Sequence, residues 1–99
     1  MLKYLAIKKY GSKLLPTLIA RYGVQQHYSA SQIRSTIYQK GFNPDFLPLG
    51  YLLFLAKDEL TRVLSVEFPE LCIITYKNEM VNYLDEKRYQ GYLEILAES

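Results

Sequence analysis

The sequence predicts an all-α protein, a compact bundle of five or six short-to-medium helices with a buried central helix near residues 48–66. The first observation is the densest apolar run of the chain, residues 46–64, in which apolar residues recur at steps of three and four. The second is a composition of 49% hydrophobic and 22% charged residues, which is typical of a globular protein. The third is a length of 99 residues without a repeat or a linker, which predicts a single helical domain over residues 1–99.

The N-terminal part of the chain contains two short helical patterns separated by a glycine. Residues 2–10 form the first, and Gly11 resembles the glycine that follows a helix C-terminus. Residues 13–22 form the second, with Pro16 in its first turn, because a proline deeper inside breaks the hydrogen-bond ladder. The inward positions expected for the two helices are Leu2, Leu5 and Ala6, then Leu15, Leu18, Ile19 and Tyr22. A single kinked helix over residues 2–22 is the alternative.

A third helix is predicted over residues 30–40. Ser29, followed three residues later by Gln32, has the spacing of a capping box, in which side chain and backbone bond each other at a helix start. The apolar stripe of this helix consists of Ala30, Ile33 and Ile37. Because the stripe is narrow and the other faces are polar, we expect this helix to be the most exposed of the bundle. Gly23 before it and Gly41 after it suit the ends of helices.

The central helix follows the turn sequence Asn43-Pro44-Asp45. Pro48 suits the first turn of this helix, where a missing N–H costs nothing. Its apolar positions are Leu49, Leu52, Leu53, Ala56, Leu60, Val63 and Leu64. Asp58-Glu59 could begin a separate helix, but the apolar positions continue past it without a change of phase. We therefore expect one helix that runs to about Val66 and is covered by the other helices.

The C-terminal third begins where Phe68-Pro69 ends the central helix, because a residue before proline avoids helical geometry. Residues 71–77 contain β-branched side chains and fit either a strand or a helix; we favour the helix, since no partner strand is evident. The inward positions of this segment are Leu71, Ile74, Val81 and Leu84. A last helix over residues 86–97, capped by Asp85, completes the bundle. Its inward positions are Tyr89, Leu93 and Leu96.

No group of residues has the spacing of a catalytic or metal site, so we expect neither an enzyme nor a cofactor. His27 is the only histidine and Cys72 the only cysteine, so a zinc or thiolate cluster lacks ligands. The apolar neighbours of Cys72 predict a small buried hydrophobe. The adjacent acids Asp58-Glu59 and Asp85-Glu86 point apart on a helix, and no phosphate-binding loop occurs.

The charge of the chain is divided between its halves. Residues 1–50 carry seven basic residues and one acidic residue, a net +6, whereas residues 51–99 carry five basic and nine acidic residues, a net −4. Such halves could attract each other within a chain or across a dimer, or the basic half could face an anionic partner. The main hypothesis is therefore a non-enzymatic protein–protein interaction or adaptor module, whose partner is another protein or, in a homodimer, a second copy of the chain.

The alternative hypothesis is nucleic-acid binding by the basic first half, where cations would contact phosphates while some of the ten tyrosines stack on bases. The candidate phosphate contacts are Lys8, Lys9, Lys13, Arg21, Arg34 and Lys40. A helix-turn-helix fits poorly, because five residues separate Gly23 from Ser29, where its turn holds about three or four. Tyrosine also has a structural interpretation, in which its ring completes the core edge and its hydroxyl stays in water.

The sequence shows no secretory or membrane segment, which predicts a cytoplasmic protein. The longest apolar run, residues 46–56, is shorter than the about 20 residues that cross a bilayer. The N-terminus lacks the apolar stretch and the cleavage site of a signal peptide. No feature points to a small-molecule substrate.

Two stretches resemble known proteins: YSASQIR at residues 28–34 and FLPLGYLLF at residues 46–54. They are similar to short uncharacterised bacterial proteins that are grouped as a domain of unknown function. The resemblance implies a helical fold and a bacterial source. It implies no activity, ligand or catalytic residue.

Overall fold

Five α-helices and one short 3-10 helix make up the described part of the chain. The computed structural model describes the backbone of residues 2–86 and the side chains of residues 5–86. In chain order the elements are α1 (Leu2–Tyr22), α2 (Ala30–Gln39), η1 (Pro44–Phe46), α3 (Leu47–Phe54), α4 (Lys57–Glu67) and α5 (Ile73–Glu86). No strand occurs among residues 2–86, and the prediction of a small all-α bundle is confirmed.

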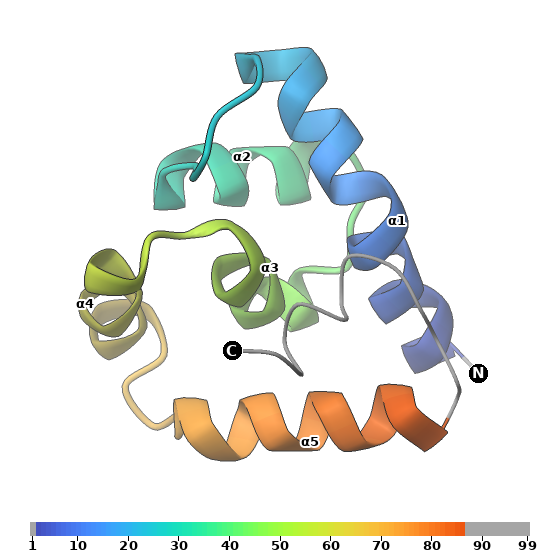
Figure 1. Cartoon of the computed structure of the whole chain (residues 1–99), viewed down its shortest axis with the longest axis vertical. Coiled ribbons are helices and arrows are strands. Elements are labelled where there is room, and N and C mark those ends of the chain that lie inside the picture. Colours follow the sequence, from blue (N-terminus) through green and yellow to red (C-terminus); the bar gives the residue numbers. More distant parts are fainter. Residues whose placement is uncertain (1, 87–99) are drawn as a thin grey trace.

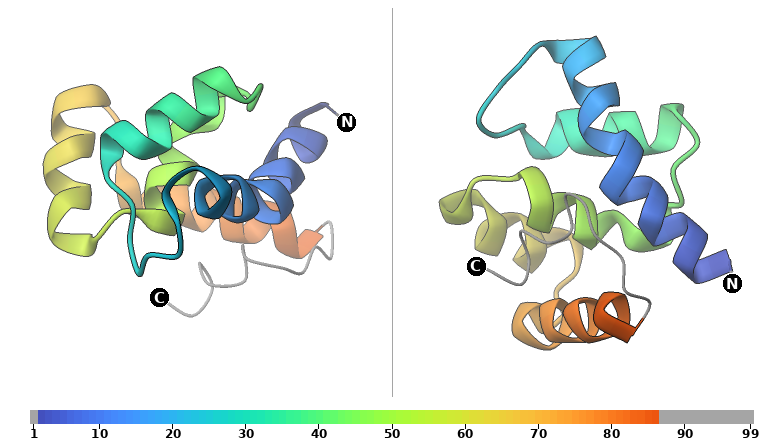
Figure 2. Two further views of the ribbon diagram at one scale, coloured as in Figure 1. Left: turned by 90° about the horizontal axis from the view of Figure 1, so that it is seen from above. Right: turned by 45° about the vertical axis from the view of Figure 1, so that its right-hand side comes forward.

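Helix α3 lies at the centre, with α2 on one side and α5 on the opposite side, while α1 and α4 flank it (Figure 1). Two further views show the same arrangement (Figure 2). The buried side chains of α3 include Leu49, Tyr51 and Phe54. Gly50 allows close packing, because a Cβ there would lie 3.0 Å from Cδ1 of Ile37 on α2. The other helices therefore approach the α3 backbone directly, as expected for the buried centre of a bundle.

The central helix is shorter than predicted, because the chain breaks between α3 and α4. Leu55 and Ala56 have extended backbone angles, with ψ values of 143° and 145°. A new helix then begins with Asp58 and Glu59 in its first turn, where acidic side chains favour the positive helix end. The prediction of one helix over residues 48–66 is wrong. Of these two helices, only α3 is buried along most of its length, whereas α4 is amphipathic and leaves Val66 73% exposed.

Helix α1 is one continuous helix that contains both Gly11 and Pro16, so the prediction of two helices is wrong and the single-helix alternative is correct. One unbroken buried stripe explains this continuity. The stripe consists of Ile7, Tyr10, Leu14 and Leu18, each 0% exposed. Leu5 and Ile19, which were expected to face inward, are 56% and 37% exposed. Burial along the whole stripe outweighs the about 3 kcal/mol that an interior proline costs.

Helix α2 begins and ends as predicted. The Ser29 side chain accepts a hydrogen bond from the Gln32 backbone N–H, and the Gln32 side chain accepts one from the Ser29 N–H. Gly41 has a positive φ of 75°, a conformation that favours glycine. The helix is seated more deeply than expected, because Thr36 is also 0% exposed. The Thr36 hydroxyl donates to the Gln32 carbonyl, which satisfies it inside the core.

Helix α5 begins at Ile73, so the choice of helix over strand is confirmed from that residue onward. Its buried side chains are Met80 and Leu84, whereas Ile74, which was expected to face inward, is 69% exposed. Cys72 is also exposed, which contradicts its prediction as a buried hydrophobe. The helix predicted over residues 86–97 lies outside the described residues. Among the described residues, no helix is both long and apolar enough to cross a membrane.

Candidate functional site

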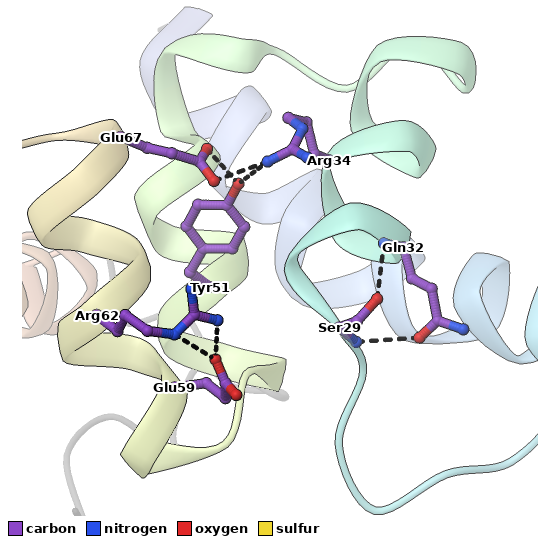
Figure 3. Close-up of polar contacts among 7 residues, drawn as sticks. All are labelled: Ser29, Gln32, Arg34, Tyr51, Glu59, Arg62 and Glu67. Atoms are coloured by element: carbon purple, nitrogen blue, oxygen red, sulfur yellow. Dashed lines mark hydrogen bonds and ion pairs between the residues drawn. The ribbon is translucent and has the colours of Figure 1, made fainter.

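A cluster of three polar side chains joins α2, α3 and α4 at one surface (Figure 3). The Tyr51 hydroxyl donates to a Glu67 carboxylate oxygen at 2.6 Å. The Arg34 guanidinium donates to the other Glu67 oxygen at 2.7 Å and to the Tyr51 oxygen at 3.3 Å. Each of the three residues therefore contacts the other two, although Arg34 and Glu67 lie 33 positions apart in sequence.

The charges and protonation states of this cluster suit a link that holds helices together better than a site of proton transfer. Burial and then the hydrogen bond to Glu67 raise the pKa of Tyr51, so its hydroxyl keeps its proton. The hydrogen bond to Tyr51 and the charge of Glu67 raise the pKa of Arg34, so the cation is retained. A neutral donor between two opposite charges holds helices together and supplies no acid or base near neutral pH.

Next to this cluster, an open cleft lies where the chain passes from α4 to α5. Its volume is about 450 Å³. The residues that line it are Glu67, Phe68, Pro69, Glu70 and Leu71, and we call it the α4–α5 cleft. Three of the five are apolar and two are acidic, so the floor is apolar and the charge is negative. Glu67 belongs to both features, since it lines the cleft and holds Arg34 and Tyr51.

Exposed apolar residues lie close to the α4–α5 cleft along the chain. Val66 precedes it and is 73% exposed, and Ile74 follows it and is 69% exposed. Between them, the Cys72 sulfur accepts a hydrogen bond from the Thr75 hydroxyl at 3.3 Å, which lowers the pKa of this thiol. Sequence reasoning missed this corner, because it assigned Ile74 to the core.

A second hollow, of about 250 Å³, lies along α1. Its lining residues are Leu5, Lys8, Lys9, Ser12 and Lys13, and we call them the α1 basic face. Lys9 is held in place, because its ammonium donates to the Gly41 carbonyl at 3.0 Å and lies 4.9 Å from the centre of the Phe42 ring. Three of the six basic residues singled out in the sequence are thus brought together by one helix.

Of the other three basic candidates, Arg21 and Arg34 bond other side chains, whereas Lys40 precedes Gly41, whose carbonyl accepts the hydrogen bond from Lys9. Arg34 is paired with Glu67, as described above. Arg21 donates to the Gln39 side chain at 2.6 Å and lies eight residues beyond Lys13 on α1, about 12 Å along the helix. Lys40 is exposed and forms the C-cap of α2.

Two of the tyrosines that adjoin polar or basic residues are unavailable for stacking on bases. Tyr10 is 0% exposed and donates to the Asn43 carbonyl at 2.6 Å. Tyr28 is 2% exposed and donates to the Gly23 carbonyl at 2.7 Å. Their rings belong to the core, which agrees with the structural interpretation of tyrosine, although their hydroxyls bond to protein and not to water.

The described residues do not provide a set of metal ligands. His27 is exposed in the link between α1 and α2. Over residues 2–86, no three side chains among His, Cys, Asp and Glu lie together in a way that could hold a metal ion.

Comparison with protein-family models gives one match over residues 1–92, to a model described as a family of unknown function (DUF6559). No curated protein and no solved structure matches the chain.

Proposed function

The chain belongs to DUF6559, a family of unknown function, and we propose that it is a non-enzymatic protein–protein interaction module that binds its partner in the α4–α5 cleft. The observation that carries this proposal is the open apolar cleft of about 450 Å³ between two acidic residues, Glu67 and Glu70. Small globular proteins usually bury such apolar surface, and contiguous exposed apolar patches mark sites of association.

The rigidity of the cleft supports the same proposal. Phe68 packs edge-on against the Tyr51 ring, with ring centroids 6.4 Å apart. Glu67 is held by Tyr51 and Arg34. A partner that enters the cleft therefore meets aromatic and carboxylate groups that are already ordered, which reduces the entropy lost on binding.

This proposal is tested by affinity capture from a lysate of the source cells with three baits. The baits are the wild-type protein, Pro69→Arg in the cleft, and Asn78→Arg as a matched control on the exposed surface of α5. We expect a protein that the wild type and the control retain equally and that Pro69→Arg loses. Titration calorimetry with that purified protein should then show the same order. Equal capture of every protein by all three folded baits would contradict the proposal.

A second candidate function is nucleic-acid binding through the α1 basic face, and the observation that favours it is the grouping of Lys8, Lys9 and Lys13 on one helix. Fluorescence anisotropy with mixed DNA and RNA oligonucleotides at about 50 mM salt tests it. Replacing Lys8 and Lys13 by Ala should reduce the slope of log K against log salt by about 2, whereas Lys57→Ala should not. Absence of binding at this salt concentration would rule the function out.

A further inference from the structure

We propose that the occupant of the α4–α5 cleft is a second copy of this chain, which inserts its α1 basic face. This inference depends on the proposed function, because it names the partner of the same cleft. It assigns Leu5 as the apolar residue that enters the cleft and the lysines around it as partners of Glu67 and Glu70.

The chemistry of the cleft specifies this kind of occupant. An apolar floor of Phe68, Pro69 and Leu71 favours an apolar side chain, and the two glutamates favour basic residues beside it. The charge of the surrounding chain has the same sign. Residues 51–86 carry three basic and seven acidic residues, a net −4.

The α1 basic face has the complementary chemistry. Leu5 is 56% exposed, and Lys8, Lys9 and Lys13 follow it at three, four and eight positions, which places all four on one side of the helix. Residues 5–50 carry six basic residues and one acidic residue, a net +5. The bond from Lys9 to the Gly41 carbonyl keeps one lysine ordered, while Lys8 and Lys13 are exposed.

The α1 basic face and the α4–α5 cleft are separate surfaces of the molecule. In the view of Figure 1 the N-terminal half of α1 lies on the right side of the molecule, and the connection between α4 and α5 lies on the left side. A chain therefore cannot fill its own cleft. Two copies related by a twofold axis can exchange both contacts and close as a dimer, whereas a contact that repeats without this exchange gives a larger ring or an open chain.

The contact should be weak and sensitive to salt. Its ionic part consists of solvent-exposed pairs, which salt screens over about 10 Å at 0.1 M. Its apolar part is one leucine in an open cleft. Association should therefore appear at high protein concentration and low salt, and should decrease as salt is added.

Sedimentation velocity with two complementary variants tests the inference. The first variant, Leu5→Gln with Lys8→Gln and Lys13→Gln, disables the α1 basic face and keeps the cleft. The second, Pro69→Arg, disables the cleft and keeps the α1 basic face. Asn78→Arg and Lys57→Gln are matched controls for an added and a removed surface charge. Circular dichroism and thermal unfolding establish that each variant is folded.

We expect the wild type and both controls to associate at low salt, as dimers or larger species, and each disabled variant alone to stay monomeric. An equimolar mixture of the two disabled variants retains one functional contact, so it should form a one-to-one dimer and nothing larger. A wild type that is monomeric at every concentration, or assemblies that neither variant reduces, would overturn the inference.

The two proposals fail in distinguishable ways. If the wild type is monomeric but Pro69→Arg still loses a captured protein, the second copy is not the partner and the interaction module stands. If the wild type is monomeric and no captured protein depends on the cleft, both proposals are wrong.

Discussion

Tyrosine is the residue that does most to join the parts of this molecule. Tyr10 bonds the loop after α2, Tyr28 bonds the turn after α1, and Tyr51 bonds the end of α4. In each case the ring packs in the core and the hydroxyl donates to another segment of the chain. These three tyrosines therefore serve packing, which composition alone could not distinguish from binding.

Buried tyrosines predict a loss of stability in alkaline solution. Burial is the main cause that raises the pKa of Tyr10, Tyr51 and Tyr76. Below a pH of about 10, these residues are protonated in the folded and unfolded chain alike, so their contribution to stability is fully present. Above it, the unfolded chain releases these protons first. The free energy of unfolding should then fall by up to about 1.4 kcal/mol per pH unit for each tyrosine.

This pH dependence is measured by urea unfolding from a pH of about 8 to about 11. The variant Tyr10→Phe should show a shallower fall than the wild type, since one of the three groups is missing. A free energy of unfolding that stays constant over this whole range would show that these hydroxyls are not shielded from water.

The substitution Tyr51→Phe should destabilise the protein by about 1–2 kcal/mol. It removes the hydroxyl that donates to the charged Glu67 and accepts from Arg34, and bonds to charged groups are worth more than neutral ones. Tyr38→Phe is the matched control, because Tyr38 is 62% exposed, and we expect a change within about 0.5 kcal/mol. Equal urea midpoints for the two variants would mean that the three-residue cluster contributes nothing to stability.

At the scale of elements, the features set by neighbouring residues could be predicted and those set by distant packing could not. The capping box at Ser29 and the glycine ends at Gly23 and Gly41 are local, and each is found where the sequence places it. The break at Leu55 is different, because the apolar positions keep helical spacing across it. The spacing of apolar residues cannot reveal two extended residues when the helical phase of the apolar positions is the same before and after them.

The prediction for α1 is wrong in the opposite direction. Gly11 and Pro16 suggested a boundary between two helices, but the packing of the buried stripe favours one continuous helix. The sequence does contain the stripe of Ile7, Tyr10, Leu14 and Leu18, but the expected inward positions were chosen separately for two shorter helices. Pro16 lacks the N–H that would bond the Ser12 carbonyl, and the Thr17 hydroxyl does not replace it, because it donates to the Lys13 carbonyl at 2.7 Å.

The substitution Pro16→Ala should therefore stabilise the protein, by about 1–2 kcal/mol. Pro16 is exposed, so no core contact is lost, and alanine restores a backbone donor and removes the strain of an interior proline. Part of this gain is offset because alanine frees the unfolded chain. Thermal unfolding measures the change; a lower melting temperature for the variant would mean that α1 needs the proline to fit against α2 and α3.

For the whole molecule, the sequence indicated the charges of the candidate surfaces but not their geometry. The lysines of the α1 basic face lie within one helical stretch, so their grouping could be expected from spacing. Predicting the α4–α5 cleft would have required knowing where α5 begins. Predicting the pairing of Arg34 with Glu67 would have required knowing the tertiary fold. Thus one surface follows from local spacing, and the other depends on contacts between residues far apart in sequence.

The most direct test of the account joins the two surfaces chemically. Equal amounts of unlabelled and ¹⁵N-labelled protein are mixed at low salt, treated with a carbodiimide that links lysines to carboxylates without a spacer, and digested for mass spectrometry. We expect links of mixed isotope content between Lys8 or Lys13 of one copy and Glu70 of another. These links should be lost in Pro69→Arg and kept in Asn78→Arg. Links between copies that involve only other residues, or no such links at all, would contradict the account.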